Sequence, residues 1–333
     1  MQVVFLNTME KQTDEGGIQN AQLSICEQQG KWQVIWQEDG QASEQESLVW
    51  FEGASWEEML LSFRIGAATK MGEGFVPVID GMLDDRKRMK SASGATYLQC
   101  YGELHGNAKL FEELRAWRRS KMVELRKPAY LIANNQMMWM LSAFVPHTEA
   151  EIMQIPGWGK AKNEAYRNEV LAIMAEYEQP HPFPLDWVAH TIDPKRYMQW
   201  LYKQKEESFK LEMQWHQEKR LILEGVQDGH SLDQLRSVVD IPTRELLIRM
   251  EQFEREGYDL ETFIERELEN VPDHEQQRLW DALETVGDRY LKPVLKQAYN
   301  AEELKSSSIE VLYDRLRLVR LRYRRKLNNA DAV

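Results

Sequence analysis

The feature that most constrains the fold of this chain is a change in the spacing of its apolar residues near residue 105. Before that point, apolar and polar residues alternate in short runs bounded by Gly, Gln, Asp and Ser, a pattern typical of strands. Beyond it, apolar residues recur three and four positions apart, as in helices. We therefore expect an α+β protein that is mainly α, with a small antiparallel sheet formed by residues 3–6, 21–26, 32–36 and 48–51.

A helix is expected directly after the sheet. Ser55-Trp56-Glu57-Glu58 is a capping box, in which the Ser55 side chain accepts a hydrogen bond from a free amide at the helix start and Glu58 reaches back. Met59, Leu60 and Phe63 follow with helical spacing, so this helix should cover one face of the sheet. Residues 1–105 would then be a small acidic α+β domain, and no motif in it indicates its role.

The length of 333 residues allows two or three domains of about 100–150 residues each. We place a helical bundle at residues 106–178 and an all-helical domain at residues 188–333. Between them, Pro180, Pro182 and Pro184 alternate with other residues, which favours extended polyproline II conformation over helix. Residues 179–187 are therefore predicted to be an interdomain linker.

Charge is unevenly distributed along the chain. The net charge is −12, which disfavours binding of nucleic acid over the whole protein surface. Residues 1–105 carry 8 Lys and Arg against 16 Asp and Glu, residues 106–178 carry 10 against 9, and residues 179–333 carry 24 against 29. Basic surface is expected only in the middle of the chain and near its C-terminal end. The C-terminal stretch has only two acidic residues, Glu310 and Asp314, among its basic residues, which are Lys305, Arg315, Arg317, Arg320, Arg322, Arg324, Arg325 and Lys326.

Several classes of function are disfavoured. The only cysteines are Cys26 and Cys100 and the 7 histidines are scattered, so neither a disulfide framework nor a metal site is expected. The chain has no G-x-x-x-x-G-K-[ST] loop, which excludes a helicase motor, and no cofactor site is indicated. The apolar stretch at residues 137–145 is far shorter than the ~20 residues of a membrane span, and the start lacks the basic region of a secretory signal. We therefore expect a cytoplasmic protein that is not an enzyme and contacts no membrane.

Four blocks between Leu110 and Tyr177 have the order and spacing of a known module. They are Leu110-Phe111-x-x-Leu114-Arg115-x-Trp117-Arg118, Pro128-x-Tyr130-x-Ile132-x-Asn134, Pro146-x-Thr148-x-x-Glu151-Ile152 and Ile155-x-Gly157-x-Gly159-x-x-Lys162. The segment resembles the HRDC domain found at the C-terminus of RecQ-type helicases and RNase D. The resemblance implies a stand-alone helical bundle that binds single-stranded or partly duplex nucleic acid weakly. A helical chain beyond residue 105 leaves no room for the strand-borne carboxylates of an RNase D nuclease.

The segment 231–255 is predicted to form a helix-turn-helix. Ser231-Leu232-Asp233-Gln234 is a capping box, and two helices, 231–239 and 243–255, should flank a turn at Asp240-Ile241-Pro242. Their inner faces are expected to be Leu232, Leu235 and Val238 on the first helix and Leu246, Leu247, Met250 and Phe253 on the second.

The C-terminal half resembles, more loosely, the helicase-associated helix-turn-helix region at the tail of some bacterial RecQ-type proteins. The similarity lies in Gly229-x-Ser231-Leu232-x-x-Leu235, in Gly257-Tyr258-Asp259-Leu260 and in Leu316-x-x-Val319-Arg320. In the last helix a core-facing seam is expected, with the arginines left on the surface for nucleic acid, an acidic partner or the acidic first domain. The seam residues are Leu312, Leu316, Val319, Tyr323 and Leu327.

The candidate binding residues fall into three groups. Tyr130 matches a position that stacks on unpaired bases in the RecQ relatives, although it could equally be a half-buried tyrosine with an exposed hydroxyl. The basic residues near it, which either attract phosphates or are only solvated, are Arg118, Arg119, Lys121, Arg126 and Lys127. A second group could hold a phosphate at a helix start or simply connect two helices: Gly157, Gly159, Lys160 and Lys162. The third group, Thr243, Arg244 and Arg249, could face DNA, but Glu245, Glu251 and Glu254 lie among them.

These observations lead to two hypotheses, while a third, a hydrolase that uses acidic residues of the first domain, has no residues at catalytic spacing to support it. The first is a non-enzymatic accessory protein that binds single-stranded or partly duplex DNA or RNA and assists a separate helicase or nuclease. The second is a protein-interaction adaptor in which the HRDC surface binds a protein partner.

Overall fold

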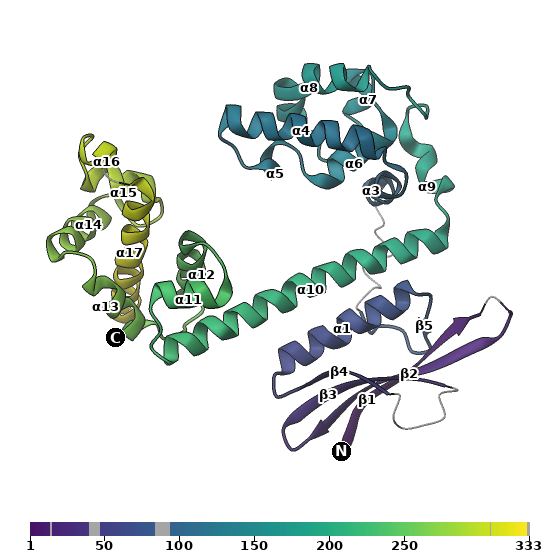
Figure 1. Cartoon of the computed structure of the whole chain (residues 1–333), viewed down its shortest axis with the longest axis horizontal. Coiled ribbons are helices and arrows are strands. Elements are labelled where there is room, and N and C mark those ends of the chain that lie inside the picture. Colours follow the sequence, from purple (N-terminus) through teal and green to yellow (C-terminus); the bar gives the residue numbers. More distant parts are fainter. Residues whose placement is uncertain (14, 40–46, 84–93, 307, 332–333) are drawn as a thin grey trace. The chain divides into compact units, whose positions relative to one another are not determined.

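The computed structural model describes residues 1–13, 15–39, 47–83, 94–306 and 308–331 (Figure 1). The chain divides into two compact units, Met1–Met213 and Gln214–Val333. The first unit contains a five-stranded antiparallel sheet and a helical bundle, and the second is helical. The expected α+β, mainly α fold is therefore confirmed.

The sheet has the strand order β4-β3-β2-β1-β5. The strands are β1 (Gln2–Gln12), β2 (Ile18–Gln28), β3 (Lys31–Glu38), β4 (Leu48–Gly53) and β5 (Val76–Pro77). Neighbouring strands pair in antiparallel fashion: β2 and β3 are consecutive strands joined by a short turn, whereas β5 follows α1 and pairs with β1. Alternate side chains such as Leu23, Val34 and Trp36 are buried on one face.

Helix α1 (Trp56–Gly72) covers that face, as predicted. The Ser55 side chain accepts a hydrogen bond from the Glu58 amide at 3.2 Å, so the predicted cap is present. Met59 and Phe63 join the core of the sheet. Gly66 lets the helix approach β4 closely, because a Cβ atom there would lie 2.1 Å from the Trp50 ring.

The helical bundle of the first unit follows. Its helices are α3 (Gly94–His105), α4 (Ala108–Leu125), α5 (Ala129–Ile132), α6 (Asn135–Phe144), α7 (Glu149–Ile152) and α8 (Lys160–Met174). Helix α6 supplies much of the core, since Met137, Met138 and Leu141 are buried. Thr148 and Glu151 make the predicted capping box at the start of α7.

Residues 179–187 differ from the extended linker that the prolines predict. Leu185 is only 5% exposed and belongs to the core of the helical bundle, against which Phe183 and Trp187 also pack. The Leu185 amide donates to Gln154 Oε1 at 3.1 Å. The apolar residues between the prolines explain the difference, because burying them on the bundle stabilises the segment more than solvation does. The helical elements here are η2 (Leu185–Trp187) and α9 (Val188–Thr191).

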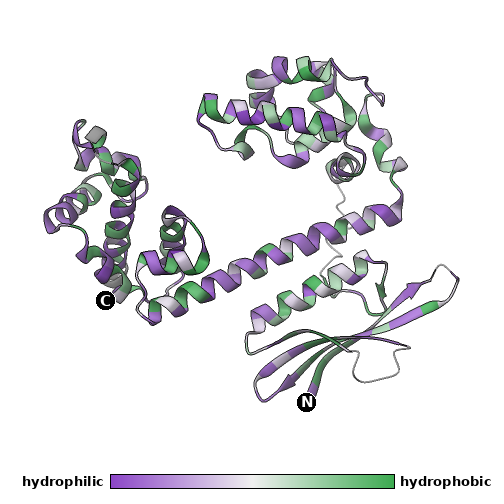
Figure 2. Ribbon diagram, in the orientation of Figure 1, coloured by the Kyte–Doolittle hydropathy of each residue, from purple (hydrophilic) through white to green (hydrophobic). Residues whose placement is uncertain are grey.

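Helix α10 (Pro194–Gln227) is long, and Figure 2 shows its mostly hydrophilic colouring. Within the first unit, Tyr197 and Trp200 pack with Cys100 of α3, and the Trp200 indole donates to Glu103 at 2.7 Å. Tyr202 joins the core beneath the sheet. The start of α10 therefore contacts both parts of this unit. The predicted boundaries at residues 105/106 and 187/188 stay predictions.

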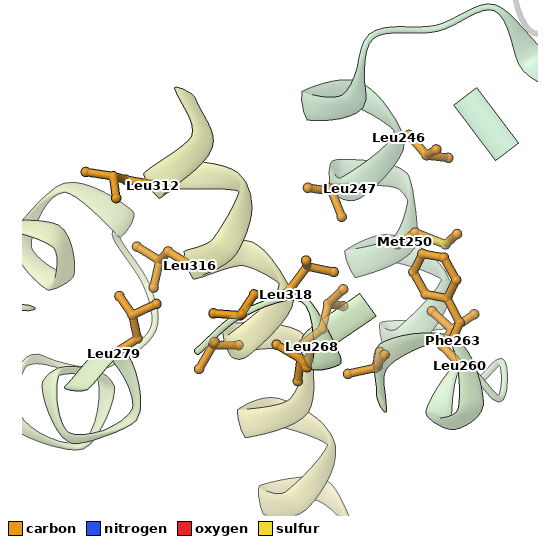
Figure 3. Packing of buried hydrophobic residues seen from close by; sticks show 14 of the residues in the cluster. Leu246, Leu247, Met250, Leu260, Phe263, Leu268, Leu279, Leu312, Leu316 and Leu318 are labelled. Carbon is orange, nitrogen blue, oxygen red and sulfur yellow. The ribbon is translucent and has the colours of Figure 1, made fainter. Parts of the chain in front are cut away.

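The second unit is built around α17 (Ile309–Asp331), against which α12, α13, α14 and α15 pack. Figure 3 shows Leu312, Leu316 and Leu318 of α17 among the buried leucines of its neighbours. The other helices are α11 (Leu232–Val239), α12 (Thr243–Arg255), α13 (Glu261–Glu269), α14 (Asp273–Val286), α15 (Leu291–Ala298) and α16 (Glu303–Ser306).

Helices α11 and α12 agree with the predicted helix-turn-helix elements, and Asp240 between them has φ +50°. Two apolar residues were placed on the wrong face. Val238 is 48% exposed and Leu327 is 47% exposed, whereas Leu235 and Leu316 are fully buried. In the last turn of α11 the buried position is taken by Val239 instead of Val238, and Leu327 lies in the last turns of α17, six residues beyond the buried Leu321.

Candidate nucleic-acid interface

Tyr130 lies on the four-residue helix α5, and its side chain is 69% exposed. Leu131 next to it is 53% exposed, whereas Ile132 and Ala133 are completely buried in the bundle. Pro128 before the helix has φ −58°, close to the value its ring imposes. The backbone is thus anchored on one side, and the Tyr130 ring projects into solvent on the other. The exposed ring fits the stacking interpretation better than a half-buried tyrosine.

Two basic side chains hold the C-terminal end of α5. Lys162 Nζ of α8 donates to the carbonyl oxygens of Leu131 and Ile132, each at 2.7 Å. Arg118 Nη1 of α4 donates to the Ala133 carbonyl at 2.8 Å. Burial lowers the pKa of Lys162, and burial together with the nearby Arg115 charge lowers the pKa of Arg118. We call these two residues the α5 clamp, since their donors are used on backbone carbonyls.

The remaining basic residues near Tyr130 are not equivalent. Arg119, Arg126 and Lys127 are exposed. Lys121 instead pairs with Glu124 at 2.7 Å and with Glu169 at 2.6 Å, and the hydrogen bonds to those carboxylates raise its pKa. Its charge is therefore already balanced within the bundle.

Two exposed apolar residues in the same region were missed by sequence reasoning. Val123 is 78% exposed and Leu125 is 37% exposed in the last turn of α4. Val123 lies off the stripe of Leu110 and Leu114, and this position is the signal that could have found it; Leu125 continues the stripe, so its spacing gave no such signal. We call the exposed residues from the second half of α4 to α5 the α4–α5 surface; they are Arg119, Val123, Arg126, Lys127, Tyr130 and Leu131.

The Gly157-Trp158-Gly159 turn connects α7 and α8. Gly157 has φ +85°, a conformation that favours glycine, and the Trp158 ring is 2% exposed. The Trp158 indole donates to Asn163 Oδ1 at 3.3 Å, and Asn163 in turn donates to Glu149 at 2.6 Å. These contacts support the helix-connection interpretation. Gly159 begins α8 without a side-chain cap, and Lys160 is exposed beside it, so phosphate binding there stays a prediction.

The predicted DNA-facing residues of α12 have internal partners. Arg249 forms an ion pair with Glu218 and a second with Glu245 at 2.8 Å, and its side chain is only 15% exposed. Thr243 Oγ1 accepts a weak hydrogen bond from Arg236 at 3.5 Å. Arg244 is exposed. The structure therefore places these three residues in different environments instead of on one shared surface.

The arginines of α17 were expected on the surface, and this expectation is wrong for two of them. Arg317 is 6% exposed and Arg320 is 7% exposed. Arg320 forms a buried double hydrogen bond with Glu251 of α12, and Arg325 pairs with Glu254 of the same helix at 3.3 Å. Two of the three acidic residues that weaken α12 as a DNA reader, Glu251 and Glu254, are thus partners of α17. Lys305 lies outside the residues whose side chains are described.

Two features are absent from the described part of the chain. No group of three or more His, Cys, Asp and Glu side chains is placed to hold a metal ion. None of the described helices is both long enough and apolar enough to cross a membrane.

An exposed aromatic ring beside basic residues is a combination that proteins binding single-stranded nucleic acid use. The comparison with protein families identifies the domain. Residues 107–174 match the family model of the HRDC domain, so this segment of the chain is an HRDC domain, which is a non-catalytic domain associated with nucleic-acid and helicase contexts. No curated protein and no solved structure matches the chain. The similarity of the C-terminal half to RecQ-type tails stays a prediction.

Proposed function

We propose that this protein is a non-enzymatic accessory factor whose HRDC domain binds single-stranded or partly duplex DNA or RNA. The observation that carries the proposal is the 69% exposed Tyr130 ring, fixed by the α5 clamp next to the exposed Arg126 and Lys127. An exposed ring offers a stacking platform for any base, and the flanking cations attract phosphates without reading sequence.

Binding should be weak. The −12 net charge opposes the approach of a polyanion, and Lys121 and Arg249 are neutralised by internal partners. A weakly binding domain without a motor suits a role beside a separately encoded helicase or nuclease. We also place the protein in the cytoplasm, in keeping with its two buried free cysteines, Cys26 and Cys100.

The α4–α5 surface supports a second candidate function, a protein-interaction adaptor. Val123 and Leu131 are large apolar side chains in solvent, and neither can attract phosphate. Exposed apolar residues gathered in one place mark protein interfaces. This reading requires no nucleic-acid binding by the surface.

Fluorescence anisotropy with a labelled single-stranded oligonucleotide separates the two functions. Tyr130→Ala should lose ~1–3 kcal/mol of binding free energy per stacked base with an unchanged salt slope, and Tyr130→Phe should bind like the parent. Lys127→Ala should weaken binding modestly and reduce the slope by roughly 0.7 per lost phosphate contact.

Thermal denaturation of each variant checks that the fold is retained. Parental binding by a folded Tyr130→Ala variant, or affinity that does not fall between about 50 mM and about 200 mM salt, would contradict nucleic-acid binding by this surface and favour the adaptor.

A further inference from the structure

The segment Arg289–Ala298 in the second unit is basic without an acidic residue. Its charged side chains, Arg289, Lys292 and Lys296, are all exposed. Within the described residues none of the three has an acidic partner. This sets the segment apart from α17, where Arg320, Arg324 and Arg325 are held by carboxylates.

The two lysines lie on the solvent face of α15, four residues apart, while Val294 and Leu295 anchor the opposite face in the core. Side chains at this spacing are neighbours on a helix, and like charges there repel each other. No acidic residue of α15 relieves the repulsion. An anionic ligand would relieve it.

Tyr290 lies between Arg289 and Lys292 in the sequence and is 62% exposed. The Arg289 guanidinium carbon is 5.3 Å from the centre of its ring. The loop before it is fixed on α17, since Arg324 Nε donates to Asp288 Oδ2 at 2.5 Å and Arg320 Nη1 donates to the Asp288 carbonyl at 3.1 Å. The ring is therefore presented on an ordered backbone, which lowers the entropy lost when a ligand binds.

We propose that Arg289, Tyr290, Lys292 and Lys296, the α15 surface, form a second site for single-stranded nucleic acid. A base stacks on Tyr290 or on the neighbouring Arg289 guanidinium plane, and Lys292 and Lys296 pair with flanking phosphates. An acidic peptide would satisfy the cations but would leave the exposed ring unused, so the ring favours nucleic acid. The inference rests on the proposed function, because both sites take the same class of ligand, but it uses residues of the other unit.

Anisotropy of the full chain with a labelled oligo-dT strand tests the site in a Tyr130→Ala background. Adding Tyr290→Ala should weaken the remaining binding roughly 5- to 160-fold, whereas Tyr290→Phe should preserve it. Lys292→Gln with Lys296→Gln should reduce the salt slope by about 1.4, for two lost single-strand phosphate contacts. The charge-matched control is Lys31→Gln with Lys203→Gln, two exposed lysines elsewhere, which should leave the slope nearly unchanged. Circular dichroism checks that each variant is folded.

Photo-cross-linking of the parent protein to an oligonucleotide carrying 5-iodouracil, followed by peptide mapping, separates this inference from the HRDC proposal. Cross-links at both Tyr130 and Tyr290 support both sites. Cross-links at Tyr130 alone, with parental binding by Tyr290→Ala, overturn the α15 surface and leave the HRDC proposal standing. Cross-links at Tyr290 alone, with parental binding by Tyr130→Ala, overturn the HRDC proposal and leave the α15 surface standing. A third probe is labelled polyglutamate. If it binds the parent and the Tyr290→Ala variant equally and displaces the oligonucleotide, the surface binds acidic peptides and the inference is overturned. Absence of any oligonucleotide binding at about 50 mM salt overturns both.

Discussion

The Lys162 amine donates hydrogen bonds to the Leu131 and Ile132 carbonyl oxygens, so its role is to position the helix that carries Tyr130. Lys160, two residues earlier, is exposed. The two lysines belong to one sequence block, yet one is a support and the other is a free cation. A charge in a motif therefore contributes to ligand attraction only where the fold leaves it without an internal partner.

Replacing Lys162 with methionine tests this role. Lys162→Met keeps most of the side-chain length but leaves two carbonyls without their donor, which should lower the free energy of unfolding by ~1–3 kcal/mol. Oligonucleotide affinity should fall because α5 loosens, with little change in salt slope since no phosphate contact is lost. Lys160→Met is the matched control and should leave the melting temperature unchanged. A melting temperature for Lys162→Met equal to the parent's would show that the clamp is not needed.

Glu149 is a second residue whose contacts predict a measurable effect, a dependence of fold stability on pH. Its pKa is lowered from 4.5, first by the hydrogen bond from Arg167 and then by that from Asn163, the residue that holds Trp158. A carboxyl with a lowered folded-state pKa stabilises the fold above its unfolded pKa, and this contribution is lost as the pH falls through the folded value.

The Glu149→Gln variant should therefore melt below the parent at pH 7. The difference should persist down to about pH 4.5 and then shrink at lower pH. Melting curves of both proteins, measured by circular dichroism over this range, check the expectation. A difference that stays constant down to about pH 3 would mean that the introduced amide disturbs the site sterically.

At the scale of elements, local signals predicted most of the fold. The caps at Ser55, Thr148 and Ser231 start helices where expected, because a side-chain oxygen that accepts a backbone amide acts within a few residues. The segment 179–187 was not predictable in this way, since its conformation depends on docking against residues such as Gln154 and Phe144 that lie elsewhere in the sequence. Within the candidate site, the motif around Tyr130 indicated an exposed aromatic ring. The sequence could not show which basic residues act as clamps, form ion pairs or stay free, because tertiary contacts decide this.

The pairing of α12 with α17 is the clearest such contact. Arg320 and Glu251 are both buried and joined by hydrogen bonds at 2.5 and 2.6 Å. Arg320→Met should lower the free energy of unfolding by ~3–5 kcal/mol, because the Glu251 carboxylate would remain buried without its counter-charge. Adding Glu251→Gln should recover part of the loss. Urea denaturation of the single and double variants measures both effects, and Arg322→Met, at an exposed neighbouring position, is the control.

A double variant that is no more stable than Arg320→Met would contradict this explanation. It would mean that the Arg320 side chain acts mainly through packing or through its hydrogen bond to the Asp288 carbonyl.

For the whole molecule, the balance of charge decides how much basic surface is available to a ligand. The total of −12 can be counted from the sequence, but the fraction of cations already paired cannot. Arg249, Arg320 and Arg325 are held by acidic neighbours, which removes most of the basic character expected of the helix-turn-helix and of α17. Among the described residues, exposed cations lie on the α4–α5 surface and on the α15 surface, and others such as Lys160 and Arg244 are scattered, so binding should depend on a few phosphates and on stacking.

The same view of the whole chain predicts that it has no ATPase activity. ATP hydrolysis by a helicase needs a glycine-rich loop that cradles the phosphates and a lysine that reaches them, and no G-x-x-x-x-G-K-[ST] sequence occurs in the 333 residues. Gly159-Lys160 lacks the required spacing, and it follows the α7–α8 turn where the motif needs a strand. Phosphate release from ATP, measured with and without single-stranded DNA, should equal that of a buffer control. Turnover that co-purifies with the chain through several columns and disappears with Lys160→Met would show that this turn holds a nucleotide after all.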